Sequence, residues 1–413
     1  MYICNRMINM QYYTRALENL LKMSKCGRKK VILLFGARQC GKTTLFKHII
    51  KTDKCVNINL QDRVLRRRYE ADEGLLIREL RAIEGNSVIF IDKVQKVPDL
   101  LDDIQLLYDE NPEKYQFYLT GSSARKLKHD SANLLPGRSH HYVLSPVMQV
   151  EQRKAIILSI DFLSTESRFP IRSLDNYLLY GNLPGYYGED INSWKETLKT
   201  YADLYLENEI RQENIVGNMG AFARFLKIAA MDAGQVINYS KMASVVGVAV
   251  NTLRNFYQVL EDTFVGIRIR SFSSNRKRIT AAPRFIFFDI GVRHILADLP
   301  LNPEILRIDG GHIFEQWVLA ELYYRCLYHG PGYNLSTWRT KTGVEVDAVV
   351  ETPDRVIPIE IKWTDKPHPH DARHVEKFIT EHSYKCDRGF VVCRTPINQQ
   401  LTERVTALPW NIF

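Results

Sequence analysis

The sequence predicts an α/β fold in which a parallel sheet carries a phosphate-binding loop. A short apolar run, Val31 to Phe35, leads directly into the pattern Gly36-x-x-x-x-Gly41-Lys42-Thr43, and a helical stretch follows from Thr44 to Ile50. A second apolar strand, Ser87 to Asp92, ends in a carboxylate. Strands and helices alternate between residues 31 and 148, which is typical of a parallel sheet with both faces covered.

The composition restricts the class of protein. At 413 residues the chain is long enough for two to four domains, and 45% hydrophobic with 25% charged residues is ordinary for globular protein. No apolar run approaches a membrane span, the N-terminus is polar, and the seven cysteines form no C-x-x-C pair. We therefore expect a cytoplasmic protein without membrane segments, disulfide framework or zinc site. The net charge of +9 fits a nucleic-acid partner, DNA or RNA, but does not require one.

The phosphate-loop pattern predicts a site for a nucleoside triphosphate. Gly36 and Gly41 allow the backbone to turn with its N–H groups pointing inward, and Lys42 would reach the β- and γ-phosphates. The hydroxyl of Thr43 and the carboxylate of Asp92 would bind Mg²⁺. The alternative is a structural glycine-rich turn. The candidate ATP-binding residues are Gly36, Ala37, Arg38, Gln39, Cys40, Gly41, Lys42, Thr43, Thr44 and Asp92.

Two positions bear on whether a bound nucleotide is hydrolysed. Lys93 directly follows Asp92, and a lysine cannot accept a proton near neutral pH unless it is strongly desolvated. A fourth predicted strand, Gln116 to Thr120, leads into Gly-Ser-Ser, where Thr120 or Ser122 could sense the γ-phosphate or position water. Lys93 and Ser122 are therefore both candidate catalytic-site residues.

The middle of the chain is predicted to be helical and then to contain a helix-turn-helix. The cluster Gly181-Asn-Leu-Pro-Gly185 interrupts the first helices. A helix from Tyr239, with Ser240 as N-cap and Gly247 at its end, precedes a second helix from Asn251 to Glu261. Two apolar strands then flank a basic stretch, as in a winged helix. Thr252, Arg254 and Asn255 would face a DNA groove, and Arg276, Lys277 and Arg278 would meet phosphates. The alternatives are a protein-interaction module and a structural linker.

The last hundred residues contain a second set of residues suited to metal chemistry. Asp347 lies on one predicted strand, Glu360 and Lys362 share a face of the next, and Glu315 lies on a preceding helix. Asp347 and Glu360 would bind Mg²⁺ or Mn²⁺, Lys362 would orient water or stabilise the transition state, and Glu315 could complete the site. The alternative is a structural ion pair between Glu360 and Lys362.

Together these stretches resemble the AAA+ class of P-loop ATPases. The closer resemblance is to a prokaryotic family whose ATPase core precedes a winged helix and a restriction-endonuclease-like, PD-(D/E)xK, domain of unknown function. The matching stretches are GARQCGKTT, IFIDKVQKVPDL, LTGSSARKL, LLPGR and YGNLPGYY, together with Asp347 and Glu360-x-Lys362.

The resemblance implies four regions and an oligomer. We expect an AAA+ core with an N-terminal helix at 1–170, a helical lid at 171–225, a winged helix at 226–300 and a restriction-endonuclease-like α/β domain at 301–413. Arg138 would be the arginine finger that acts on a neighbouring subunit of a homo-oligomer, unless it pairs with a local carboxylate. The family usually has Glu where this chain has Lys93, so hydrolysis would be impaired.

Three functional hypotheses follow from the sequence. The first is an ATPase that couples nucleotide state to DNA binding or nuclease-like action. The second is an ATP-stabilised scaffold or switch that does not hydrolyse ATP, and the third is a metal-dependent nuclease regulated by ATP.

Overall fold

The computed structural model describes residues 11–23, 29–50, 52, 55–124, 134–162, 167–204, 217–272, 282–340 and 342–413. The basic residues Arg276, Lys277 and Arg278 lie outside these ranges. None of the described helices is both long and apolar enough to cross a bilayer.

The N-terminal part is a five-stranded parallel sheet with the order β2-β3-β4-β1-β5. Its strands are β1 (Val31–Phe35), β2 (Cys55–Asn59), β3 (Ser87–Asp92), β4 (Tyr115–Thr120) and β5 (Ser139–Val143). The helices are α1 (Leu17–Met23), α2 (Lys42–Ile49), α3 (Arg63–Ala71), α4 (Leu75–Arg81) and α5 (Leu100–Glu110), with the short turns η1 (Val94–Lys96) and η2 (Gln149–Glu151).

Both faces of this sheet are covered, as its apolar strands predict. Ile32 and Leu34 pack on the side of α2, where Phe46 is buried, whereas Leu33 packs on the opposite side with the helices α4 and α5. The order of the strands places β4 between β1 and β3, so the carboxyl ends of these three strands meet at one edge. The phosphate-loop sequence leaves the sheet at that edge.

A helical region follows, and it ends in an antiparallel hairpin. Three helices, α9, α10 and α11, precede the hairpin of β6 and β7. The elements are α7 (Leu174–Tyr180), η3 (Pro184–Gly188), α8 (Ile191–Leu204), α9 (Met219–Met231), α10 (Tyr239–Val246), α11 (Val250–Asp262), β6 (Gly266–Ser271), β7 (Arg284–Phe287) and α13 (Ile290–Leu296).

The C-terminal part is a mixed sheet that incorporates this hairpin. The order of its eight strands is β12-β13-β11-β10-β9-β8-β6-β7, and β6 joins β8 through Arg270 opposite Ser336. The elements are α14 (Glu304–His329), β8 (Asn334–Arg339), β9 (Glu345–Glu351), β10 (Val356–Ile361), η5 (Pro369–Ala372), α15 (Arg373–Glu381), β11 (Gly389–Cys393), β12 (Gln399–Gln400) and β13 (Val405–Pro409).

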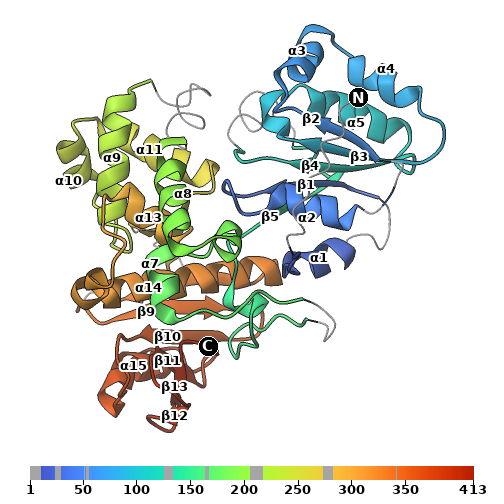
Figure 1. Cartoon of the computed structure of the whole chain (residues 1–413). Coiled ribbons are helices and arrows are strands. Elements are labelled where there is room, and N and C mark those ends of the chain that lie inside the picture. Colours follow the sequence, from blue (N-terminus) through green and yellow to red (C-terminus); the bar gives the residue numbers. More distant parts are fainter. Residues whose placement is uncertain are drawn as a thin grey trace.

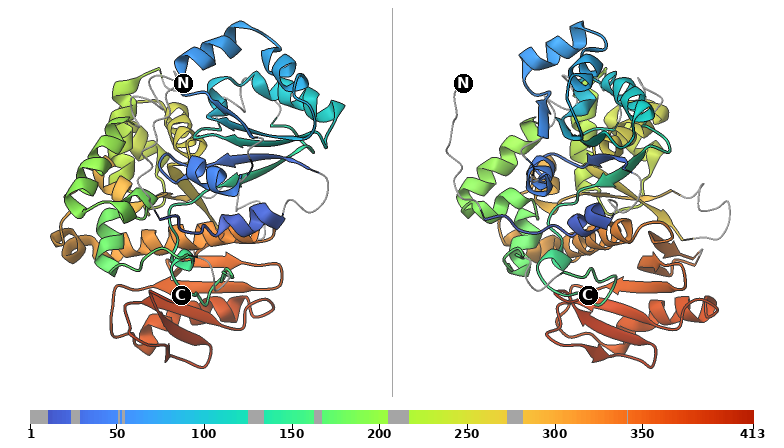
Figure 2. Two further views of the ribbon diagram at one scale, coloured as in Figure 1. Left: turned by 45° about the vertical axis from the view of Figure 1, so that its right-hand side comes forward. Right: turned by 90° about the vertical axis from the view of Figure 1, so that its right-hand side faces the viewer.

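The long helix α14 lies between the other parts of the molecule. It runs along the C-terminal sheet on one side, and the N-terminal sheet and α7 lie on its other side (Figures 1 and 2). The hydroxyl of Tyr328, near its C-terminal end, bonds to the backbone N–H of Ser145 just after β5 at 3.0 Å. One helix therefore packs on the C-terminal sheet and also contacts the segment that follows β5.

One local expectation needs correction. Helix α10 is capped by Asn238, whose side chain accepts a hydrogen bond from the N–H of Lys241, and not by Ser240. Before α1, the backbone N–H of Thr14 donates to the carbonyl of Ser167.

Candidate functional site

The phosphate loop adopts the turn that its glycines predict. Gly36 has a φ of 141°, and a Cβ there would lie 2.6 Å from the carbonyl oxygen of Leu144. Gly41, with a φ of 91°, is the N-cap of α2. A side chain at Gly36 would collide with backbone, so this glycine allows the loop to pack against the residue that follows β5.

The candidate lysine of the loop is buried inside it. The Nζ of Lys42 donates to the carbonyl oxygens of Gly36 at 2.7 Å and Ala37 at 2.6 Å. The α2 helix begins at Lys42, so its N-terminal N–H groups and this ammonium group lie at the same loop. Both features favour an anion such as a polyphosphate.

The two candidate magnesium ligands are in direct contact. The hydroxyl of Thr43 lies 3.1 Å from each carboxylate oxygen of Asp92. Thr120, on the strand between them, also donates to Asp92 and accepts the backbone N–H of Lys93 at 3.1 Å. Hydroxyl and carboxylate oxygens are ligands that Mg²⁺ prefers, so the residues present fit an ATP-bound magnesium ion.

Lys93 and Ser122 follow neighbouring strands at this edge. Lys93 has a left-handed backbone, with a φ of 64°, and begins the turn η1. Ser122 is buried, and its hydroxyl accepts a hydrogen bond from the side chain of Gln95 at 2.9 Å. Gln95, two residues after Lys93, is not among the site residues that the sequence predicted. Its other side-chain atom, Oε1, is buried and has no hydrogen-bond partner within the described parts of the chain.

The remaining loop residues differ in their exposure. Gln39 and Thr44 are exposed, Ala37 and Cys40 are buried, and Arg38 is intermediate. Burial raises the pKa of the Cys40 thiol to about 11. Cys40 therefore contributes its backbone to the loop, while its neutral side chain packs in the core.

Two side chains that the sequence did not predict for the site, Arg15 and Pro184, contact the phosphate loop. Arg15, which precedes α1, donates to the carbonyl of Cys40 at 2.8 Å and forms a buried ion pair with Glu151 at 2.9 Å. Burial raises the pKa of Glu151, and Arg15 opposes that shift. Pro184, in the turn between α7 and α8, lies 3.8 Å from the position of a Cβ on Gly41. The helical region thus reaches the phosphate loop.

Arg138 lies at the opposite edge of the sheet. It directly precedes β5, and its carbonyl accepts the N–H of Val31, the first residue of β1. Its guanidinium forms two hydrogen bonds with Asp109, at 2.5 and 2.9 Å. Because the phosphate loop follows the other end of β1, Arg138 cannot reach the loop of its own chain.

The proposed DNA-facing side of α11 is exposed in part. Arg254 and Asn255 are exposed, and Thr252 is intermediate. The guanidinium of Arg254 also lies over the ring of Tyr239, 4.4 Å from its centre.

In the C-terminal sheet, Asp347 and Glu360 lie on paired strands as expected. Ala348 opposes Ile359 in the antiparallel register, which places Asp347 opposite Glu360. Asp347 accepts the N–H of Ile361 at 2.8 Å, and Lys362 forms an ion pair with Glu360 at 2.7 Å. Burial raises the pKa of Asp347 well above its ordinary value, and the neighbouring Glu360 raises it further.

Glu315, which the sequence suggested could complete a metal site, forms an ion pair with Arg284, the first residue of β7. Within the described part of the chain, no three His, Cys, Asp or Glu side chains converge closely enough to hold a metal ion. The contacts therefore match the alternative in which Glu360 and Lys362 form a structural pair.

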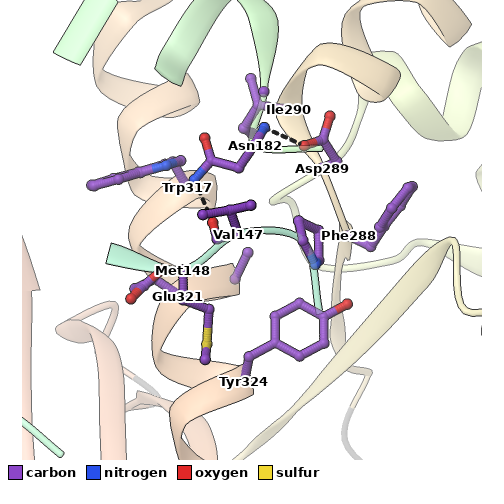
Figure 3. Close-up of a pocket in the computed structure, with 12 residues that line it drawn as sticks. Val147, Met148, Asn182, Phe288, Asp289, Ile290, Trp317, Glu321 and Tyr324 are labelled. Atoms are coloured by element: carbon purple, nitrogen blue, oxygen red, sulfur yellow. Dashed lines mark hydrogen bonds between the residues drawn. The ribbon is translucent and has the colours of Figure 1, made fainter. Parts of the chain in front are cut away.

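A small cavity of about 30 Å³ marks the junction of the three parts (Figure 3). It is lined by residues from the loop after β5, the turn after α7, the start of α13 and the helix α14. Asn182 joins two of these elements, since its side chain donates to the carbonyl of Val147 at 2.9 Å and its backbone N–H donates to Asp289 at 2.6 Å.

Comparison with known protein families divides the chain into three consecutive regions. Residues 28–152 match the model of an AAA domain, and residues 171–303 and 310–413 match two domains of unknown function, DUF8612 and DUF4143. The chain is 26% identical to an uncharacterized protein of Mycobacterium tuberculosis, covering 82% of this chain and 72% of the relative. It is 22% identical to an uncharacterized protein of Methanocaldococcus jannaschii, covering 96% and 87%.

Matches among solved structures include two proteins at low sequence identity. The Walker-type ATPase of Pyrococcus abyssi is 14% identical with a TM-score of 0.45, covering 69% of this chain and 96% of that one. The AMPPCP-bound DnaA of Aquifex aeolicus is 15% identical with a TM-score of 0.26, covering 61% and 89%. The match over residues 28–152, together with the loop and the Thr43–Asp92 contact, identifies this part of the chain as an AAA-type P-loop ATPase domain that is followed by two domains of unknown function.

Proposed function

We propose that the protein is an ATP-binding switch that hydrolyses ATP slowly. The observation that carries this proposal is the contact between Thr43 and Asp92, at 3.1 Å, next to the buried amine of Lys42. These groups supply what Mg²⁺–ATP needs: oxygen ligands for the ion and positive charge for the phosphates.

Lys93 is the reason for slow hydrolysis. In the ATPase family that the sequence resembles, this position usually carries a Glu whose carboxylate activates the attacking water. An ammonium group there favours binding of the γ-phosphate but cannot take a proton from the attacking water.

The test is to measure ATP binding and phosphate release for the natural protein, Lys93→Glu and Lys93→Gln. The natural protein should bind Mg²⁺–ATP and release phosphate near background. Lys93→Glu should raise release by about tenfold or more, since a positioned base contributes roughly 10²–10⁴-fold. Lys93→Gln, which removes the charge without adding a base, is the matched control. Brisk turnover by the natural protein would contradict the proposal.

DNA contact through α11 is a second candidate, favoured by the exposed Arg254 and Asn255. Replacing both with Ala should weaken DNA binding, and loss of the positive charge of Arg254 should reduce its salt dependence, because fewer counterions are then released. Arg307→Ala, at an exposed arginine of α14, is the control. Equal binding by both variants, with and without ATP, would remove α11 from the DNA interface.

An oligomer in which Arg138 acts in trans is part of the same proposal. Arg138 lies at the edge opposite its own phosphate loop and pairs with Asp109, so in this proposal it would exchange that pair for the nucleotide of a neighbouring subunit. In the Lys93→Glu background, Arg138→Ala should lower phosphate release without changing ATP affinity, and Asp109→Ala should not. A protein that stays monomeric by light scattering with ATP bound would exclude this role.

Metal-dependent nuclease action is the least favoured hypothesis. Lys362 and Arg284 each pair with one of the carboxylates that would bind the metal. Mn²⁺-stimulated cleavage of DNA or RNA that disappears in both Asp347→Ala and Lys362→Ala would restore it.

A further inference from the structure

Four acidic side chains from three elements gather on one side of the C-terminal sheet. Glu315 comes from α14, Glu345 and Asp347 from β9, and Glu360 from β10. The charges of these groups influence one another, since Glu360 and Glu315 act on Asp347, and Glu315 and Glu345 act on Glu360. We call these four residues the acidic cluster.

The family resemblance implies a divalent metal at this cluster, but the arrangement does not fit one. In the described ranges no three metal-binding side chains converge on a point. Instead, basic side chains pair with its carboxylates. Lys362, directly after β10, lies 2.7 Å from Glu360, Arg339 lies 3.7 Å from Glu345, and Arg284 reaches in from β7.

Arg284 is placed as the central cation. Its side chain is only 10% exposed, and its Nη1 bonds to Glu315 while Nη2 lies 3.7 Å from Glu345. Asp347 is a further carboxylate whose charge acts on this guanidinium. A buried charge is costly unless it is paired, and here one guanidinium faces three carboxylates.

We infer that the guanidinium of Arg284 is the resident cation of the acidic cluster and takes the place of a divalent metal. Arg284 belongs to the hairpin that precedes the DUF4143 region, so it also closes the cluster from outside that domain. The backbone of Arg284 is fixed by pairing with Ile269 and with Val236. These pairings fix the point from which the side chain of Arg284 extends toward the acidic cluster.

Removal of Arg284 would leave these carboxylates without their cation, and we expect them to move together around a hard cation. The Oε2 atom of Glu360 is buried and lacks a hydrogen-bond partner among the described residues, and the side chain is 4% exposed. Without the guanidinium, Glu315, Glu345 and Asp347 would lose their shared counter-charge. Mg²⁺ and Mn²⁺, which prefer carboxylate oxygens, are the ions suited to replace it.

The test is Mn²⁺ binding to the nucleotide-free chain, followed by electron paramagnetic resonance, with Asp92→Asn present throughout to weaken the phosphate-loop site. In that background the otherwise unchanged protein should bind as little Mn²⁺ as Asp347→Asn does. Arg284→Met, which keeps the aliphatic stem, should gain about one Mn²⁺ per chain. Adding Asp347→Asn should abolish the gain, and Arg284→Lys, which keeps the charge, should show none.

Each result decides the inference. Mn²⁺ binding that depends on Asp347 while Arg284 is present would overturn it, and this comparison stands even if Arg284→Met fails to fold. A folded Arg284→Met variant that gains no Mn²⁺ would overturn it as well. Neither measurement depends on ATP hydrolysis, so the outcome is separate from that of the proposed switch.

Discussion

Arg15 and Glu151 form an ion pair, with Nε and Oε1 2.9 Å apart, in which the side chains are only 4% and 0% exposed. The same guanidinium bonds to the carbonyl oxygens of Cys40 and Ser145, each at 2.8 Å. Glu151 in turn accepts the backbone N–H groups of Ala16 and Met148. The pair thus ties the segment before α1 to the phosphate loop and to the chain that follows β5.

Arg15→Ala should destabilise the protein by about 3–5 kcal/mol, because it leaves a buried carboxylate without its counter-charge. Arg307→Ala, which breaks an exposed pair with Glu304, should cost less than about 1 kcal/mol. Denaturation in urea measures both. The double variant Arg15→Met/Glu151→Leu should recover part of the loss, and a loss in Arg15→Ala no larger than in Arg307→Ala would show that the pair contributes little.

Gly181→Ala should be much more damaging than Gly85→Ala, although both glycines have a φ of 72°. A Cβ at Gly181 would lie 2.2 Å from Asp289, whereas a Cβ at Gly85 meets nothing within 4 Å. Gly85→Ala should cost only the backbone strain of about 1–2 kcal/mol. Thermal unfolding of the two variants separates the cost of backbone strain from the cost of the collision. Equal melting temperatures would mean that Asp289 moves away from the new Cβ at little cost.

Asp289 should make the protein more stable at mildly acidic pH than at neutral pH. Burial raises the pKa of this carboxyl to about 6 from 3.8, against the hydrogen bonds from the N–H groups of Asn182, Val292 and Gly291. A raised folded-state pKa gives a stabilisation that is complete below the unfolded pKa and is lost as the pH rises through 6. The shift corresponds to about 3 kcal/mol.

Comparison of the natural protein with Asp289→Asn isolates this contribution. The difference between their unfolding free energies should change between pH 4 and pH 6 and be flat above about pH 7. Asp298→Asn, at an exposed aspartate, should show no such change. A pH-independent difference for Asp289→Asn would mean that Asp289 is ionised across this range.

Gln95→Leu should lower phosphate release in the Lys93→Glu background while leaving ATP affinity within about twofold. The reason is that Gln95 holds the hydroxyl of Ser122 at 2.9 Å, at the strand edge where the phosphates are expected. We expect phosphate release to fall roughly 10-fold or more, because groups that position the proton transfer contribute on that scale. Steady-state kinetics separates kcat from KM, and a change confined to KM would assign Gln95 to nucleotide binding instead.

The features that the sequence predicted well are those encoded by neighbouring residues. The strand from Ser87 to Asp92, the loop from Gly36 to Thr43 and the end of α10 at Gly247 each depend on a few adjacent side chains. The predicted N-cap of α10, Ser240, was wrong. Asn and Ser are both favourable N-cap residues, and the sequence alone does not show whether the helix begins after Asn238 or after Ser240.

The features that the sequence could not predict join residues far apart in the chain. Arg15 pairs with Glu151 across 136 positions, and Arg284 pairs with Glu315 across 31. The sequence suggested that Glu315 could complete a metal site, and it gave no sign that the carboxylate of Glu315 pairs with Arg284 from another element. Only the three-dimensional arrangement shows which cation a buried carboxylate meets.

The pairing of β6 with β8 has a practical consequence for anyone who studies the C-terminal region alone. A fragment that begins at residue 310, where the DUF4143 match begins, lacks the hairpin of β6 and β7. In such a fragment the outer backbone groups of β8 beside Ser336 would be unpaired, and Glu315 would lose Arg284. Exposed strand edges recruit other strands, so we expect this fragment to self-associate through β8. A fragment that begins before β6 would keep that edge covered.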